Sequence, residues 1–155
     1  MPNVSHAKSK CKCFSFLSRF FIASLFLSFF ISRMNPSFLQ VYKGKKPIIA
    51  VTAYDYPTAF ILDRKVDFFL VGDSLGMVIL GYTDTRSVTM EDMIRATEAV
   101  KRGAKKTPIF VDMPYKSYQF PEQAIENAQK LLDAGADGVK IEGVCLPILE
   151  LFKHI

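Results

Sequence analysis

Short apolar runs alternate along the chain with stretches in which apolar residues recur at helical spacing. Runs without a polar face are typical of strands buried on both sides, and a 3.6-residue recurrence predicts helices. The predicted strands are Lys46–Tyr54, Asp67–Val71, Pro108–Val111 and Asp137–Ile141. The predicted helices are Tyr56–Lys65, a helix from Thr89 to Gly103 and a helix from Pro121 to Gly135, and Leu146–Ile155 looks like the opening of another.

Two of these helices carry clear start and stop signals. Thr89 is a suitable N-cap with Asp92 three residues later, and Pro121 fits the first turn of the other helix. Glycine ends both patterns, at Gly103 and Gly135. The expected buried stripes are Met93, Ile94, Ala96, Thr97 and Val100 in the first helix, and Ala124, Ile125, Ala128, Leu131 and Leu132 in the second.

Alternating strands and helices predict an α/β fold with parallel strands and right-handed crossovers. A doubly wound sheet and a (β/α)₈ barrel both satisfy this pattern. Acidic residues at the ends of successive strands favour the barrel, whose carboxyl rim collects functional groups. Since a whole barrel takes roughly 250 residues, we expect only about the first four βα units here. The first and fourth strands would then be open edges. If expressed from Met34, the chain would be poorly soluble, because apolar strand faces and edges would be exposed.

Charge divides the chain into two parts, residues 1–33 and residues 34–155. The first part holds 5 of the 20 basic residues and no acid, whereas the second is neutral. A neutral body without a nucleic-acid-binding motif argues against nucleic acid as a partner. The three cysteines form neither a disulfide framework nor a zinc motif, which fits a reducing, cytoplasmic compartment.

The basic leader contains a Phe- and Ser-rich apolar stretch, residues 14–32. Three interpretations stay open: a signal peptide or membrane anchor, a transit peptide with a mitochondrial address, and an over-extended start upstream of Met34. The uninterrupted apolar part is shorter than the roughly 20 residues that a membrane span needs. We therefore favour the over-extended start slightly, and leave membrane association through residues 14–32 as an alternative.

Acidic side chains follow three predicted strands. Asp73, Asp112 and Glu142 should meet at one edge of a parallel sheet, and carboxylate oxygens are the ligands that Mg²⁺ prefers. Lys140 lies two residues before Glu142, so both side chains face the same way on a strand. This arrangement predicts a site for a metal and an anionic substrate.

Other polar residues have simpler interpretations. Asp55 is expected to be a turn or cap residue, and Tyr54, Tyr56 and Tyr115 are expected to pack. Ser74 has no histidine partner in the body of the chain, which argues against a Ser-His-Asp hydrolase. The turn from Gly72 to Gly76 matches neither a Walker loop nor a dinucleotide fingerprint, so nucleotide binding is not supported.

Several strings together resemble ketopantoate hydroxymethyltransferase, and they correspond to its N-terminal half. They are TAYDY (Thr52–Tyr56), VGDSLGM (Val71–Met77), VTMEDM (Val88–Met93), VDMPY (Val111–Tyr115), PEQAIENA (Pro121–Ala128) and AGADGVKIEG (Ala134–Gly143). The resemblance implies transfer of a hydroxymethyl group from methylenetetrahydrofolate to α-ketoisovalerate, giving ketopantoate for pantothenate synthesis. It also implies Mg²⁺ as cofactor and an enolate mechanism.

The resemblance assigns roles to matching positions. Asp73, Asp112 and Glu142 would hold or surround the metal. The keto acid would be bound by Asp73, Ser74, Asp112 and Lys140. The family's general base is a Glu from the second half of the barrel, which has no match here, so no catalytic base is assigned. Family members are commonly oligomeric, which implies a homo-oligomer for a full-length form.

Two rival hypotheses remain. One is another Mg²⁺-dependent barrel of the phosphoenolpyruvate and isocitrate lyase kind, which also uses an enolate and strand-end acids. The other is a non-catalytic half-barrel fragment, free or tethered to a membrane through residues 14–32.

Overall fold

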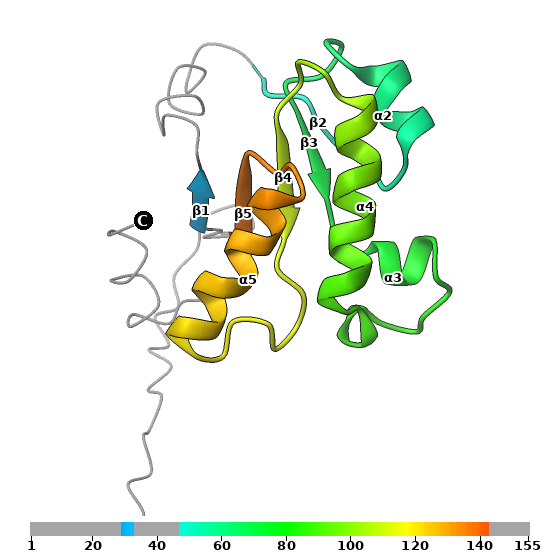
Figure 1. The fold of residues 1–155 in the computed structure, drawn as a ribbon. Coiled ribbons are helices and arrows are strands. Elements are labelled where there is room, and N and C mark those ends of the chain that lie inside the picture. The colour runs from blue at the N-terminus through cyan, green and yellow to red at the C-terminus, as the bar shows by residue number, and fades with distance from the viewer. Residues whose placement is uncertain (1–28, 33–46, 143–155) are drawn as a thin grey trace, which may run out of the picture.

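The computed structural model describes residues 29–32 and 47–142. Its centre is a five-stranded sheet with the order β1-β5-β4-β3-β2. The four strands β2 to β5 are parallel neighbours in chain order, and helices alternate with them (Figure 1). The predicted α/β class and the parallel sheet are therefore confirmed.

The element bounds lie close to those predicted. The strands are β1 (Phe29–Ser32), β2 (Ala50–Thr52), β3 (Phe68–Val71), β4 (Ile109–Asp112) and β5 (Gly138–Ile141). The helices are α2 (Tyr56–Leu62), α3 (Leu75–Val78), the 3₁₀ turn η1 (Thr85–Ser87), α4 (Met90–Gly103) and α5 (Pro121–Asp133). Among the described residues, β1, α3 and η1 were not predicted, and the expected helix Leu146–Ile155 lies outside the described residues.

Helices α4 and α5 lie side by side over one face of the sheet, and α2 packs against α4 (Figure 1). The strand residues beneath them are fully buried and belong to the main core; they include Phe69, Val71, Ile109, Val111 and Val139. Alternation along a strand places Phe110, Asp112 and Lys140 on the opposite face. The polar candidates thus face away from the helix layer.

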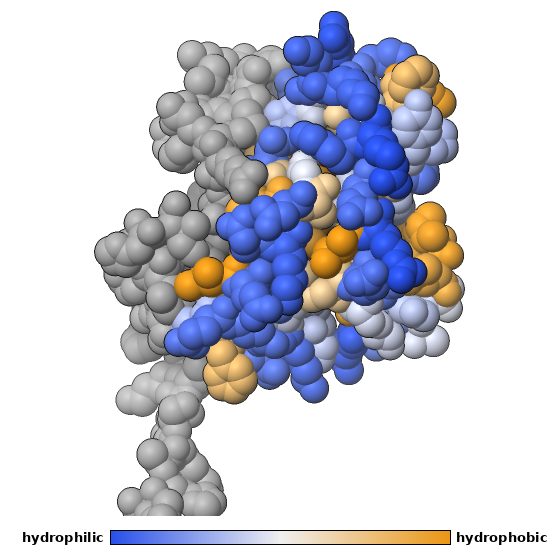
Figure 2. Space-filling view, viewed as in Figure 1, coloured by the Kyte–Doolittle hydropathy of each residue, from blue (hydrophilic) through white to orange (hydrophobic). Residues whose placement is uncertain are grey.

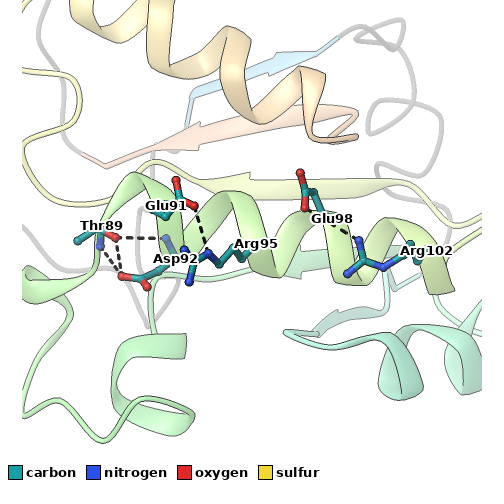
Figure 3. A network of polar contacts seen from close by, with 6 residues as sticks. All are labelled: Thr89, Glu91, Asp92, Arg95, Glu98 and Arg102. Atoms are coloured by element: carbon teal, nitrogen blue, oxygen red, sulfur yellow. Dashed lines mark hydrogen bonds and ion pairs between the residues drawn. The ribbon is translucent and has the colours of Figure 1, made fainter.

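Helix α4 starts where the sequence predicts. The Thr89 hydroxyl accepts a hydrogen bond from the Asp92 amide at 3.2 Å, and the Asp92 carboxylate accepts one from the Thr89 amide at 3.0 Å (Figure 3). This reciprocal capping box satisfies two donors that a helix start otherwise leaves unpaired. On the exposed face, Arg95 pairs with Glu91 at 3.1 Å.

Strand β2 differs from the prediction. It is shorter than expected and is exposed rather than buried on both sides. The reason is its edge position, since β3 is its only strand neighbour in the described part of the chain. Ile48 and Ile49, just before it, are also exposed.

The outer edge of β5, which was expected to be open, is paired. Strand β1 lies antiparallel to it, with Ile31 opposite Val139 and Phe29 opposite Ile141. The expectation of a free fourth strand was therefore wrong, because a segment of the leader, far away in sequence, fills that edge. No helix within residues 29–32 and 47–142 is long and apolar enough to cross a membrane. The rest of the apolar stretch 14–32 lies outside the described residues.

The surface is mixed rather than uniformly polar. Figure 2 shows polar side chains along the outer faces of α4 and α5, with apolar side chains between the two helices and around α3. The exposed apolar residues at α3 are Met77, Val78, Ile79 and Leu80. Exposed apolar side chains were expected on strand faces and edges. They also occur at α3, a helix that was not predicted.

Candidate active site

Strands β4 and β5 bring two of the candidate residues side by side. Asp112 and Lys140 are register partners in the parallel ladder, so their side chains project on the same face. The Lys140 Nζ donates to Asp112 Oδ1 and pairs with Glu142 Oε1 at 3.3 Å. Lys140 therefore bridges a buried carboxylate and an exposed one.

Asp73 and Ser74, in the segment after β3, lie near the ends of β4 and β5. The Asp73 amide donates to Asp112 Oδ2 at 3.4 Å, which ties the two strand ends together. This loop passes close to its neighbours at Gly72, where a Cβ atom would lie 2.8 Å from Ser74 Oγ. A side chain at that position would push the Ser74 hydroxyl out of place.

Ser74 also has a partner on the first βα unit. The Tyr54 hydroxyl lies 2.8 Å from Ser74 Oγ, and the two form a hydrogen bond. Tyr54 was expected only to pack, so this role was missed. Its position at the end of the predicted strand, two residues after β2 ends, was the available signal. Asp55 is an N-cap as expected, since its carboxylate accepts from the Thr58 amide at 2.8 Å.

One pocket collects the carboxylates. It is lined by Asp73, Thr85, Arg86, Asp112, Met113, Tyr115, Tyr118 and Glu142, with a volume of about 170 Å³. Pockets for drug-sized ligands measure about 300–1,000 Å³, so this smaller pocket has room for a small metabolite. Thr85 and Tyr118 were missed, because Thr85 lies in the unpredicted turn η1 and Tyr118 in a loop, neither at a strand end.

Burial and crowding of acids govern the electrostatics. Burial, followed by the nearby charge of Asp112, raises the pKa of Asp73, and a Thr85 hydrogen bond opposes this. Burial likewise raises the pKa of Asp112, although Lys140 stabilises its charged form. Burial works against the Lys140 charge, but its contacts with Asp112 and Glu142 together outweigh burial and raise the pKa of Lys140. Lys140 is thus held as a cation among carboxylates.

The three carboxylates in the pocket suit a hard cation, although they do not yet stand close enough together to bind one. Asp73, Asp112 and Glu142 line one pocket and supply only oxygens, which is the chemistry that Mg²⁺ prefers. Within residues 29–32 and 47–142, however, no three His, Cys, Asp or Glu side chains stand close enough to form a ready metal site. One Asp112 oxygen and one Glu142 oxygen contact Lys140 instead. A cation would therefore have to draw these carboxylates together.

Comparison with known proteins shows the family of the chain. The family model described as ketopantoate hydroxymethyltransferase matches residues 33–155. The chain belongs to this family. The proteins named 3-methyl-2-oxobutanoate hydroxymethyltransferase from Pyrobaculum islandicum and Aeropyrum pernix are 54% and 56% identical to it, over 68% and 65% of this chain. The protein of that name from Geobacillus sp. is 50% identical over 72% of this chain.

The ketopantoate hydroxymethyltransferase resemblance is thereby confirmed at the level of the family. These matches cover only 41%, 38% and 41% of the three relatives, so the chain spans about two fifths of their length. The family match starts at residue 33 and so excludes β1. The reported relatives are archaeal and bacterial, and they give no support to the mitochondrial alternative.

Proposed function

We propose that the protein takes part in ketopantoate hydroxymethyltransferase activity, with α-ketoisovalerate and methylenetetrahydrofolate as substrates. The observation that carries this proposal is the meeting of Asp73, Asp112, Lys140 and Glu142 at one end of a parallel sheet in a chain of this family. In the reaction, the keto acid loses a proton from C3, and that carbon forms a bond to the one-carbon unit of the folate. Water supplies the hydroxyl oxygen, and tetrahydrofolate leaves.

Each residue contributes to binding. Lys140 is held as a cation and would neutralise the carboxylate of the keto acid. The Ser74 hydroxyl, oriented by Tyr54, would donate to a substrate oxygen. Asp73, Asp112 and Glu142 would hold Mg²⁺, which when bound would polarise the keto group as a Lewis acid. Substrate oriented in this way reacts more readily, because its reactive atoms are already aligned.

The complete fold that we propose is a (β/α)₈ barrel, of which this chain supplies about four βα units. Helices α4 and α5 cover the same sheet face, which fits a barrel wall better than a doubly wound sheet with helices on both faces. The general base and part of the folate surface would come from the second half. For the full-length form we propose a homo-oligomer.

The test is an assay of the protein at its natural full length. Ketopantoate should form from α-ketoisovalerate and methylenetetrahydrofolate with Mg²⁺, and EDTA should abolish it. Asp73→Asn and Glu142→Gln should each lower kcat/KM at least a hundredfold. Cleavage of C–C bonds in hydroxy-diacids, in place of ketopantoate formation, would favour the lyase rival.

The alternative is a non-catalytic half-barrel; the chain spans about two fifths of the length of the relatives it matches. Intact mass of the protein recovered from its own cells separates the two. A mass near twice 17.5 kDa supports the enzyme, and a mass at or below 17.5 kDa supports the fragment. Pelleting with membranes, without turnover, would indicate the tethered form.

A further inference from the structure

Tyr118 lies in the loop between β4 and α5 and is half-buried at the carboxylate pocket. It lines that pocket together with Asp73, Asp112 and Glu142. Neither the strand-end pattern nor the family motifs assigned it a role. Its ring therefore occupies the candidate active site without a stated task.

The loop that carries Tyr118 is held firmly. The buried Asn127 of α5 donates from Nδ2 to the Ser117 carbonyl at 2.8 Å. The Ser117 amide donates in turn to the Pro114 carbonyl at 3.0 Å. Because the residue before Tyr118 is bonded on both sides, its backbone is fixed relative to α5. A side chain on a fixed loop can position a ligand.

The Tyr118 hydroxyl has a hydrogen-bond partner at the end of β5. Its oxygen accepts a hydrogen bond from the Glu142 backbone amide, which links the loop to the end of β5. The carboxylates of Glu142, Asp73 and Asp112 act on it through their charge. A tyrosine phenol keeps its hydrogen at neutral pH, because its ordinary pKa is about 10. That hydrogen is not used in the contact with Glu142.

We propose that Tyr118 is a substrate-positioning residue whose hydroxyl donates a hydrogen bond to an anionic oxygen of the bound keto acid. The pocket is crowded with acids, so a neutral donor can hold an anion without adding charge. The Lys140 ammonium already contacts Asp112 and Glu142. A second hydrogen-bond donor in the pocket would therefore help to bind the substrate. This inference rests on the proposed function, since it names a group that binds the proposed substrate.

The test compares Tyr118→Phe with Tyr56→Phe in the protein at full natural length. Phe keeps the ring and removes only the hydroxyl, and Tyr56 is an exposed residue stacked on Phe60, outside the pocket. Calorimetry measures binding of Mg²⁺ alone and of α-ketoisovalerate with Mg²⁺ present. We expect Tyr118→Phe to weaken keto acid binding about tenfold, as for loss of one hydrogen bond. Mg²⁺ affinity should change less than twofold, and Tyr56→Phe should change neither.

Three outcomes would overturn the inference. Unchanged keto acid binding in Tyr118→Phe would remove the donor role while leaving the proposed function intact. A parallel loss of Mg²⁺ affinity would show that Tyr118 only supports Glu142. Failure of the unaltered protein to bind the keto acid would remove the proposed function, and this inference with it.

Discussion

The hydroxyl of Tyr54 lies 2.8 Å from the hydroxyl of Ser74, and this hydrogen bond joins the first βα unit to the second. Ser74 is the N-cap residue of α3, and its side chain makes no cap hydrogen bond. The Ser74 hydroxyl is therefore oriented by Tyr54 rather than by the helix that follows it. The geometry of this candidate substrate contact depends on a residue twenty positions earlier in the chain.

We expect Tyr54→Phe to release the Ser74 hydroxyl. Unfolding free energy should fall by about 1 kcal/mol, the usual net value of such a bond, and the KM for the keto acid should rise. A double-mutant cycle with Ser74→Ala, followed by chemical denaturation, isolates the coupling between the two side chains. Strictly additive effects of the two substitutions would contradict this relationship.

Lys140→Met should destabilise the fold strongly. Its side chain is 12% exposed and that of Asp112 is 8% exposed, so the substitution leaves a buried carboxylate without its cation. Removing one partner of such a pair costs about 3 kcal/mol or more. Adding Asp112→Asn should recover part of this loss, because no buried charge then remains.

The matched control for that experiment is Lys130→Met. Lys130 pairs with Glu126 at 2.7 Å on the surface of α5, where the side chains are 48% and 69% exposed. Exposed pairs contribute about 1 kcal/mol or less. Urea denaturation measures the unfolding free energy of both variants. Equal losses of unfolding free energy in Lys130→Met and Lys140→Met would show that burial does not strengthen the Lys140–Asp112 pair.

Mg²⁺ binding should weaken as the pH falls through the raised pKa values of Asp73 and Asp112. The folded protein binds more protons than the unfolded chain between the ordinary Asp pKa of 3.8 and these raised values. These two groups therefore favour folding more as the pH falls, whereas the metal needs them ionised. Calorimetric Mg²⁺ titrations across this range should show the loss, and Asp73→Asn should flatten it. An affinity independent of pH would exclude these carboxylates as ligands.

Thr89→Ala should cost about 1 kcal/mol by removing the capping box of α4. The Thr89 hydrogen bonds lower the pKa of Asp92, so their stabilising effect is present above the unfolded pKa near 3.8 and is lost as the pH falls through the lowered value. Thermal melts of Thr89→Ala and of Thr89→Ser, which keeps the hydroxyl, should therefore differ at neutral pH and converge in acid. A constant difference at every pH would contradict the role of Asp92.

Local patterns predicted the regular elements well. The stripes of α4 and α5, the capping box and the acids after β3 and β4 all depend on residues a few positions apart. Tyr118 and Thr85 could not be found in this way, because a loop and a short 3₁₀ turn, both without periodicity, carry them to the pocket. The exposure of β2 and the pairing of β1 with β5 depend on which strands are neighbours, and no local spacing encodes that.

The polarity of β1 limits how the sheet can extend. Backbone groups of Val139 and Ile141 that face away from β4 meet a strand running in the opposite direction. A further βα unit after β5 would bring a parallel strand to the same row of donors and acceptors. The backbone groups at this edge of β5 cannot pair with both strands at once. The leader and any continuation of the proposed barrel would therefore compete for one edge. Translation from Met34 would omit β1 and decide this competition in favour of the continuation.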